Sequence, residues 1–157
     1  MPTITPNLWF DTEALEAAEY YTSIFPNSQI NLVSHYGESA GDRNGTVLTV
    51  DFTLDGQPYT AINGGPQFHF DEAISLLVNC ADQAEVDRYW ETLGADGEFG
   101  PCGWLKDKYG LSWQIAPVAI YELMTDPDDG RRDRAFAAMM QMGKIDLAAL
   151  QAAADAA

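Results

Sequence analysis

Residues 102–117 are CGWLKDKYGLSWQIAP, a pattern that predicts two short strands joined by a tight turn. The first strand ends at Leu105, and the second covers residues 111–116 until Pro117 stops it. Residues 107–110, DKYG, supply the turn because Asp and Gly tolerate turn conformations. We expect this hairpin to help line a cup in a curved sheet.

A second hairpin is predicted in the first half of the chain. Apolar and polar residues alternate from Leu48 to Leu54, which is typical of a strand with one face exposed to water. Asp55 and Gly56 form a favoured two-residue turn because both tolerate positive φ. Residues 57–63 then return as the partner strand.

The two halves of the chain carry the same order of elements. In each, a strand precedes a helix with apolar residues at three- and four-residue spacing, and further strands follow. We expect Asp11 or Thr12 to cap the first helix and Asp82 the second. The segment YYTSIF (20–25) also resembles YWETLG (89–94), a faint internal repeat.

This repeat predicts an α+β fold made of two paired βαβββ modules. Their strands are expected to form one curved, partly closed mixed sheet whose concave face makes a pocket. The modules cover about residues 1–66 and 67–117, which together make one domain, 1–117. After Pro117 the composition changes, and residues 118–157 predict a helical extension whose last helix is capped by Asp146.

Charge and cysteine content limit the partners and the location. The formal net charge of −16, from 24 acidic and 8 basic residues, disfavours nucleic acid and anionic membranes as partners. The chain shows no apolar run long enough for a bilayer and no secretory signal, so we expect a cytoplasmic location. Cys80 and Cys102 lack the spacing of a metal site or a redox pair, and we expect two free thiols.

Four segments carry a resemblance to a known family: NGGPQFHFDEAISLLVNC (63–80), EVDRYWETL (85–93), CGWLKDKYGLSWQIAP (102–117) and MMQMGKIDLAAL (139–150). Together they resemble the PhnB-like family, also labelled 3-demethylubiquinone-9 3-methyltransferase-like. That family belongs to the vicinal oxygen chelate superfamily, with glyoxalase I and the fosfomycin- and bleomycin-resistance proteins. The resemblance implies paired βαβββ modules and a homodimer.

The resemblance also implies where a metal would bind. Enzymes of the superfamily hold a divalent ion with His, Glu or Gln side chains on the first and last strands of each module. In this chain those strands offer apolar residues such as Leu8 and Ile62, then Ser75 and Gln114. Gln114 alone is a plausible ligand, and one neutral oxygen does not hold a catalytic divalent ion, so we predict no metal and no cofactor.

The methyltransferase label implies a site for S-adenosylmethionine. Such sites normally use a glycine-rich loop between a strand and a helix. The glycines of residues 94–97 follow a predicted helix, and Gly64-Gly65 is followed by Pro66. Neither segment fits this pattern, and the catalytic residues of any reaction stay unassigned.

Eight residues on or beside the predicted strands are candidates for the pocket, because aromatic walls with a few amides and hydroxyls suit a flat or amphipathic small molecule. They are Trp9, Asn63, Gln67, Ser75, Cys102, Trp104, Trp113 and Gln114. The alternative for the tryptophans is ordinary core. The alternative for Asn63 and Gln114 is a buried amide that satisfies backbone groups.

Three functions remain open from the sequence. The favoured one is a metal-free protein that binds a small molecule, akin to resistance proteins that sequester a drug. The second is an enzyme of the superfamily, either a metal-dependent lyase or isomerase or the methyltransferase of the family label. The third is a dimeric structural module with a vestigial pocket.

Overall fold

A computed structural model describes residues 2–156 of the chain. It divides into two compact units, residues 1–69 and 70–157, which are described in turn. Within the described residues, each helix is too short or too polar to cross a bilayer.

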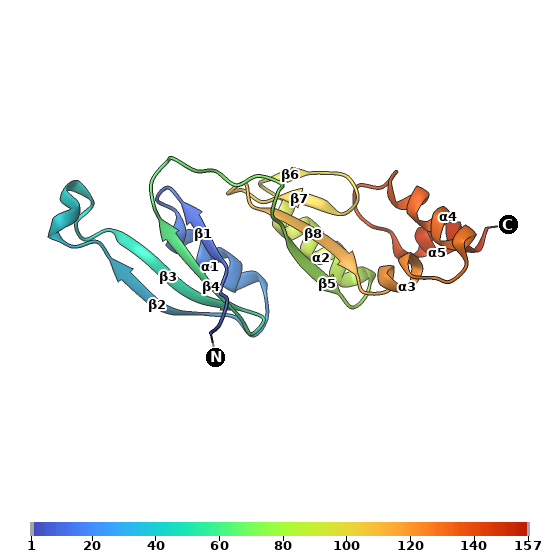
Figure 1. Cartoon of the computed structure of the whole chain (residues 1–157), viewed down its shortest axis with the longest axis horizontal. Helices are drawn as coiled ribbons and strands as arrows, with labels where there is room; N and C mark the ends of the chain where they lie inside the picture. The colour runs from blue at the N-terminus through green and yellow to red at the C-terminus, as the bar shows by residue number, and fades with distance from the viewer. Residues whose placement is uncertain (1, 157) are drawn as a thin grey trace. The chain divides into compact units, whose positions relative to one another are not determined.

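The first unit is a four-stranded mixed sheet with one long helix. The sheet has the order β1-β4-β3-β2, in which β1 runs parallel to β4 and the other neighbours are antiparallel (Figure 1). Its elements are β1 (Asn7–Phe10), α1 (Ala14–Ile24), β2 (Gln29–His35), the 3-10 helix η1 (Glu38–Arg43), β3 (Val47–Leu54) and β4 (Gln57–Asn63).

The second unit repeats this topology. Its sheet has the order β5-β8-β7-β6, with β5 parallel to β8 and the other neighbours antiparallel. The elements are β5 (Leu76–Cys80), α2 (Gln83–Gly94), β6 (Glu98–Phe99), β7 (Trp104–Lys106) and β8 (Ser112–Pro117). The predicted α+β class and the βαβββ repeat are therefore confirmed, as two open four-stranded sheets.

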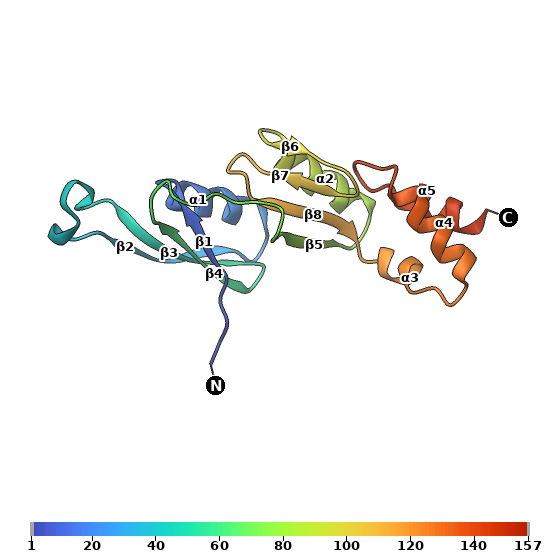
Figure 2. The same ribbon diagram turned by 45° about the horizontal axis from the view of Figure 1, so that its top comes forward.

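Helix α2 covers one face of the second sheet (Figures 1 and 2). Leu105 and Trp113 are paired across β7 and β8 and are buried on this side. Phe99, the partner of Leu105 on β6, stacks on Trp90 of α2 with ring centroids 4.9 Å apart. Because side chains alternate along a strand, the residues between these positions point to the opposite side, here called the open face.

The first sheet is organised in the same way. Phe10 and Val50 are buried on the side of α1, whereas Trp9 and Asp51 lie on the open face. Leu8, which the sequence predicted at the metal-binding position of this strand, is buried beside Phe10 on the side of α1 and does not lie on the open face. That assignment was wrong by one residue, and a shift of one residue moves a strand's side chains to the other face.

The helix caps show where local sequence predicts structure and where it does not. Asp82 and Asp146 cap α2 and α5 (Leu147–Asp155), since each carboxylate accepts a hydrogen bond from the backbone N–H three residues later, at 2.9 Å. The predicted cap of α1 by Asp11 or Thr12 was wrong. The side-chain oxygen of Asn63, at the end of β4, accepts the Ala14 N–H at 2.8 Å instead.

The predicted helical extension is also confirmed, as α3 (Ile120–Met124), α4 (Asp129–Met139) and α5. These helices bury a small core of their own around Leu123, Ala135 and Leu150. Figure 1 shows them gathered beyond the end of β8.

The loop before α5 fastens the extension to the second sheet. The backbone N–H groups of Cys102 and Gly103 donate to the carbonyl oxygens of Met142 and Gly143, both at 2.8 Å. The side chain of Gln83 in α2 donates to the Ile145 carbonyl and accepts the Leu147 N–H, both at 2.9 Å. These four bonds hold the end of α4 close to β7.

Candidate functional site

Asp107 organises the turn between β7 and β8. Its side chain is 3% exposed, and one carboxylate oxygen accepts the backbone N–H groups of Tyr109 and Leu111 at 2.8 and 3.1 Å. The other oxygen accepts the indole N–H of Trp113 at 2.8 Å. Hydrogen bonds to a carboxylate are among the strong ones, so this residue fixes both the turn and the start of β8.

A cavity of about 560 Å³ lies beside this hairpin, within the second unit. Such a volume falls in the usual range for sites that hold a small molecule. The lining comes from β6, β7 and β8, the loop before β7, the segment before β5 and the end of α4: Glu72, Glu98, Gly100, Pro101, Cys102, Trp104, Leu105, Lys106, Ser112, Met139 and Met140.

Most of the wall is apolar and polarizable. The indole of Trp104 is partly exposed, and the sulfur atoms of Cys102 and Met140 lie 3.7 Å apart. Methionine sulfur makes favourable contacts with aromatic rings, and methionine side chains adapt to the shape of a partner. The wall is therefore suited to a flat aromatic or apolar molecule.

One edge of the cavity is charged. The Lys106 ammonium lies 2.5 Å from a carboxylate oxygen of Glu72, and Glu98 is the cross-strand neighbour of Lys106. The hydrogen bond from Lys106 lowers the pKa of Glu72, and the same contact raises the pKa of Lys106. Two carboxylates against one ammonium make this edge unfavourable for an anionic ligand.

Ser112, the first residue of β8, is the polar group in the wall that the protein leaves unsatisfied. Its side chain is 0% exposed, and its hydroxyl oxygen has no hydrogen-bond partner within residues 2–156. It lies opposite Lys106 in the register of β7 and β8, on the open face.

The structure places two of the eight candidate residues, Cys102 and Trp104, in the wall of this cavity. Gln114 also lies on the open face, where its amide donates to the Ser75 hydroxyl at 2.9 Å, but neither residue lines the cavity. Trp113 lies on the side that α2 covers, with 2% of its surface exposed.

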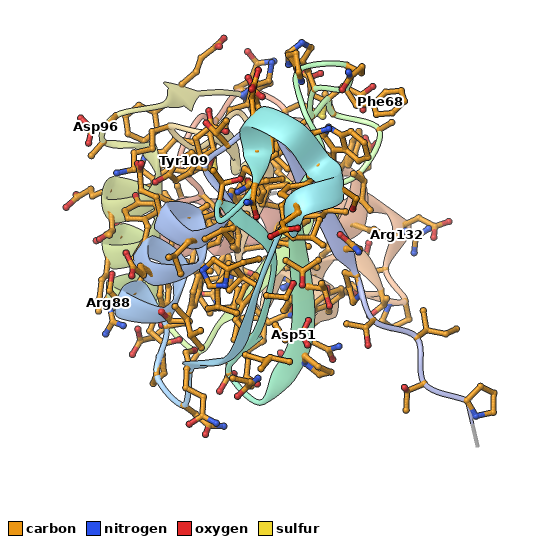
Figure 3. The ribbon with its side chains drawn as sticks, turned by 90° about the vertical axis from the view of Figure 1, so that its left-hand side faces the viewer. Asp51, Phe68, Arg88, Asp96, Tyr109 and Arg132 are labelled. Carbon is orange, nitrogen blue, oxygen red and sulfur yellow. The ribbon has the colours of Figure 1, made fainter. Side chains whose placement is uncertain are left out.

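The remaining three candidates belong to the first unit. Trp9 donates its indole N–H to the Gly65 carbonyl at 2.9 Å and meets Phe68 edge-on, with centroids 4.9 Å apart. Phe68 lies on the loop after β4 with much of its ring exposed (Figure 3). Asn63 satisfies backbone groups, through the Ala14 N–H and the Val47 carbonyl, and Gln67 is exposed.

Sequence reasoning missed Ser112, Lys106 and Met139 as cavity residues. The signal for Ser112 was available, because it has the same parity as Gln114 on one predicted strand. No local pattern indicates Met139, since it reaches the cavity only through the path of the extension.

On the first and last strands of the two βαβββ modules, the positions that face the open side do not fit a divalent metal. They carry Asn7 and Trp9 on β1, Ile62 on β4, Ser75 before β5 and Gln114 on β8. In the part of the chain that the structure describes, no three His, Cys, Asp or Glu side chains come together as a metal site. A few neutral amide and hydroxyl oxygens are a poor donor set for such an ion.

The two thiols should differ sharply in reactivity. Burial, with a smaller contribution from Glu85 and Asp82, raises the pKa of Cys80 to about 12, so almost no thiolate forms there at pH 8. Cys102 is partly exposed and lines the cavity. We expect iodoacetamide at pH 8 to modify Cys102 at least about tenfold faster than Cys80, because the thiolate is the nucleophile.

Peptide mass mapping over time measures the two rates, and unfolding in urea should make both cysteines react alike. Equal rates in the folded protein would contradict this assignment.

Comparisons with known proteins agree with the fold. The family described as 3-demethylubiquinone-9 3-methyltransferase matches residues 2–116. A solved PhnB protein from Bacillus cereus is 37% identical over 74% of this chain and 99% of its own, with a TM-score of 0.66. A Pseudomonas aeruginosa protein is 17% identical over 74% of this chain and 98% of its own, with a TM-score of 0.63, which shows the fold alone. No curated protein matches the chain.

Proposed function

Since the chain belongs to the PhnB-like 3-demethylubiquinone-9 3-methyltransferase family, we propose that it binds a small aromatic molecule in the cavity of its second unit. One observation carries the proposal, the cavity of about 560 Å³ with a mainly apolar wall. Natural small-molecule sites combine such a wall with a few placed polar groups.

The wall residues indicate the class of molecule. Trp104 offers a ring for stacking, and Cys102, Met139 and Met140 add polarizable groups to the same wall. The carboxylates of Glu72 and Glu98 disfavour an anion. The ligand in this proposal is therefore flat, largely apolar, and neutral or cationic.

Binding in this proposal needs no metal ion. The support is the donor set on the open faces, in which amide, hydroxyl, indole and aliphatic side chains stand at the strand positions that the superfamily uses for its ligands. The expected homodimer and cytoplasmic location stay predictions from the sequence.

Part of the cavity wall is formed by residues outside the segment that the family matches. That match ends at residue 116, whereas Met139 and Met140 belong to the extension that follows. The backbone bonds from Cys102 and Gly103 to residues 142 and 143 hold this segment beside β7. The extension therefore contributes to which molecules fit.

Naphthalene is a suitable first probe, because it is flat, uncharged and smaller than the cavity. We expect it to bind with a dissociation constant on the order of 10–100 µM, as ligand efficiency suggests for about ten heavy atoms. Bound naphthalene should slow the alkylation of Cys102 and leave that of Cys80 unchanged.

Mass mapping of both cysteines across a naphthalene titration makes the measurement, and S-adenosylmethionine is tested in parallel. Unchanged alkylation of Cys102 up to the solubility limit of naphthalene would contradict the proposal. Protection by S-adenosylmethionine alone would favour the methyl-transfer activity that the family name describes.

A further inference from the structure

We propose that the ligand of this cavity carries a neutral oxygen, a hydroxyl or a carbonyl, that hydrogen-bonds to Ser112. The inference rests on the proposed function and specifies the chemistry of its ligand. It starts from a serine that is 0% exposed and belongs to the residues that line the cavity, and whose hydroxyl has no partner among residues 2–156. Folded proteins rarely leave such a group unsatisfied, so its partner is expected from outside the chain.

The structure holds Ser112 firmly in place. The residue before it, Leu111, donates its N–H to Asp107, and the residue after it, Trp113, donates its indole N–H to the same carboxylate. Both neighbours are buried on the side of α2, so the Ser112 side chain stays on the open face. The backbone that carries the hydroxyl is therefore held in place, and such a preorganised group loses little freedom when a ligand binds.

The other polar groups at the cavity are already engaged or have the wrong charge for an anion. Lys106 is paired with Glu72, and Glu98 adds a second carboxylate. An anionic oxygen would meet these carboxylates while the one ammonium is already neutralised. A neutral hydroxyl or carbonyl meets no such repulsion, and a serine hydroxyl can donate to either or accept from a hydroxyl.

The wall that contains Ser112 also holds an aromatic ring, that of Trp104. Trp104 follows the same open face on β7, one strand across from β8. A ring stacked on this indole would carry its oxygen at the edge, in the plane of the ring. The geometry thus favours a neutral aromatic alcohol or ketone over a plain hydrocarbon.

Three probes of one shape test this inference: naphthalene, 2-naphthol and 2-naphthoate. The intact chain is titrated with each, and binding is measured by equilibrium dialysis and by protection of Cys102 from alkylation. We expect the chain to bind 2-naphthol about five- to tenfold more tightly than naphthalene, in line with one net hydrogen bond. The carboxylate of 2-naphthoate should bind most weakly.

Two matched variants test whether the hydrogen bond to the ligand is made by Ser112. In Ser112→Ala the preference for 2-naphthol over naphthalene should fall below about twofold, and naphthalene binding to the same variant reports that its cavity is folded. Ser75→Ala is the control, because this residue directly precedes β5 of the same sheet, its hydroxyl is bonded to Gln114, and it does not line the cavity. Ser75→Ala should keep the full preference.

The outcomes separate the inference from the proposed function. If naphthalene and 2-naphthol protect Cys102 equally in the unmodified chain, Ser112 does not bind an oxygen of the ligand. The proposed binding of an apolar aromatic molecule in the cavity is then unaffected. A preference that survives in Ser112→Ala, or tightest binding of 2-naphthoate, also overturns the inference. Failure of all three probes to bind overturns the proposed function as well.

Discussion

Replacing Asp107 with asparagine should lower the free energy of unfolding by about 3 kcal/mol, as expected when a buried, hydrogen-bonded carboxylate is disrupted. The amide oxygen can still accept the N–H groups of Tyr109 and Leu111. The amide nitrogen then faces the indole N–H of Trp113, which lies 2.8 Å from the carboxylate oxygen in the native protein. Two donors at that distance repel, and turning the amide over would lose the two backbone bonds instead.

Urea unfolding of the variant and the native chain, followed by circular dichroism, measures this effect. Asp96→Asn is the matched control, because Asp96 is an exposed carboxylate in the turn after α2 (Figure 3). The control should change stability by less than about 0.5 kcal/mol. A loss below about 1 kcal/mol in Asp107→Asn would show that Asp107 does not hold this hairpin together.

Replacing Trp104 with alanine should weaken naphthalene binding at least about tenfold. Large aromatic side chains dominate the affinity of many binding sites, and Trp104 is the only tryptophan among the residues that line the cavity. Its removal takes away the stacking surface without adding charge. Equilibrium dialysis against naphthalene measures the change.

Two further variants make this result specific. Trp104→Phe keeps an aromatic ring and should lose no more than about threefold. Phe136→Ala removes a ring from α4 that is 48% exposed and does not line the cavity, so naphthalene binding should stay unchanged. Equal affinity of Trp104→Ala and the native chain would place the aromatic site elsewhere.

Much of the fold could be predicted from local patterns in the sequence. Alternation of polar and apolar residues in 48–54, with Asp55-Gly56 after it, predicted β3 and β4 within a residue of their bounds. Asp82 and Asp146 predicted the starts of two helices because a cap acts over three residues. Asn63 was not predicted as the cap of α1, because it lies 49 residues from Ala14 in the sequence.

The candidate site was harder to predict, for a physical reason. Trp113 and Gln114 are consecutive on β8, so they point to opposite faces, and no single pocket on one face contains both. Trp104 and Gln114 do share a face, because they are paired across β7 and β8. Cys102 comes from the loop before β7, where strand parity gives no information.

Other residues of the cavity wall could not be predicted because they belong to the helical extension. In the sequence, Met139 and Met140 have the pattern of residues that fill a core or an interface, and nothing in it indicates a cavity. They line the cavity because the bonds of Gln83, Cys102 and Gly103 bring the end of α4 to the second sheet. Contacts between segments so far apart in sequence leave no periodic signal.

The most direct test of the aromatic site is a titration with 2-naphthol followed by NMR of chains labelled with carbon-13 at the methionine methyl groups. The signals of Met139 and Met140, assigned by single substitutions, should shift with one common dissociation constant because both side chains line the cavity. Met124, which lies in α3 and does not line the cavity, serves as the internal reference and should not move. Saturating 2-naphthol that leaves Met139 and Met140 unshifted, or shifts Met124 equally, would contradict the site described here.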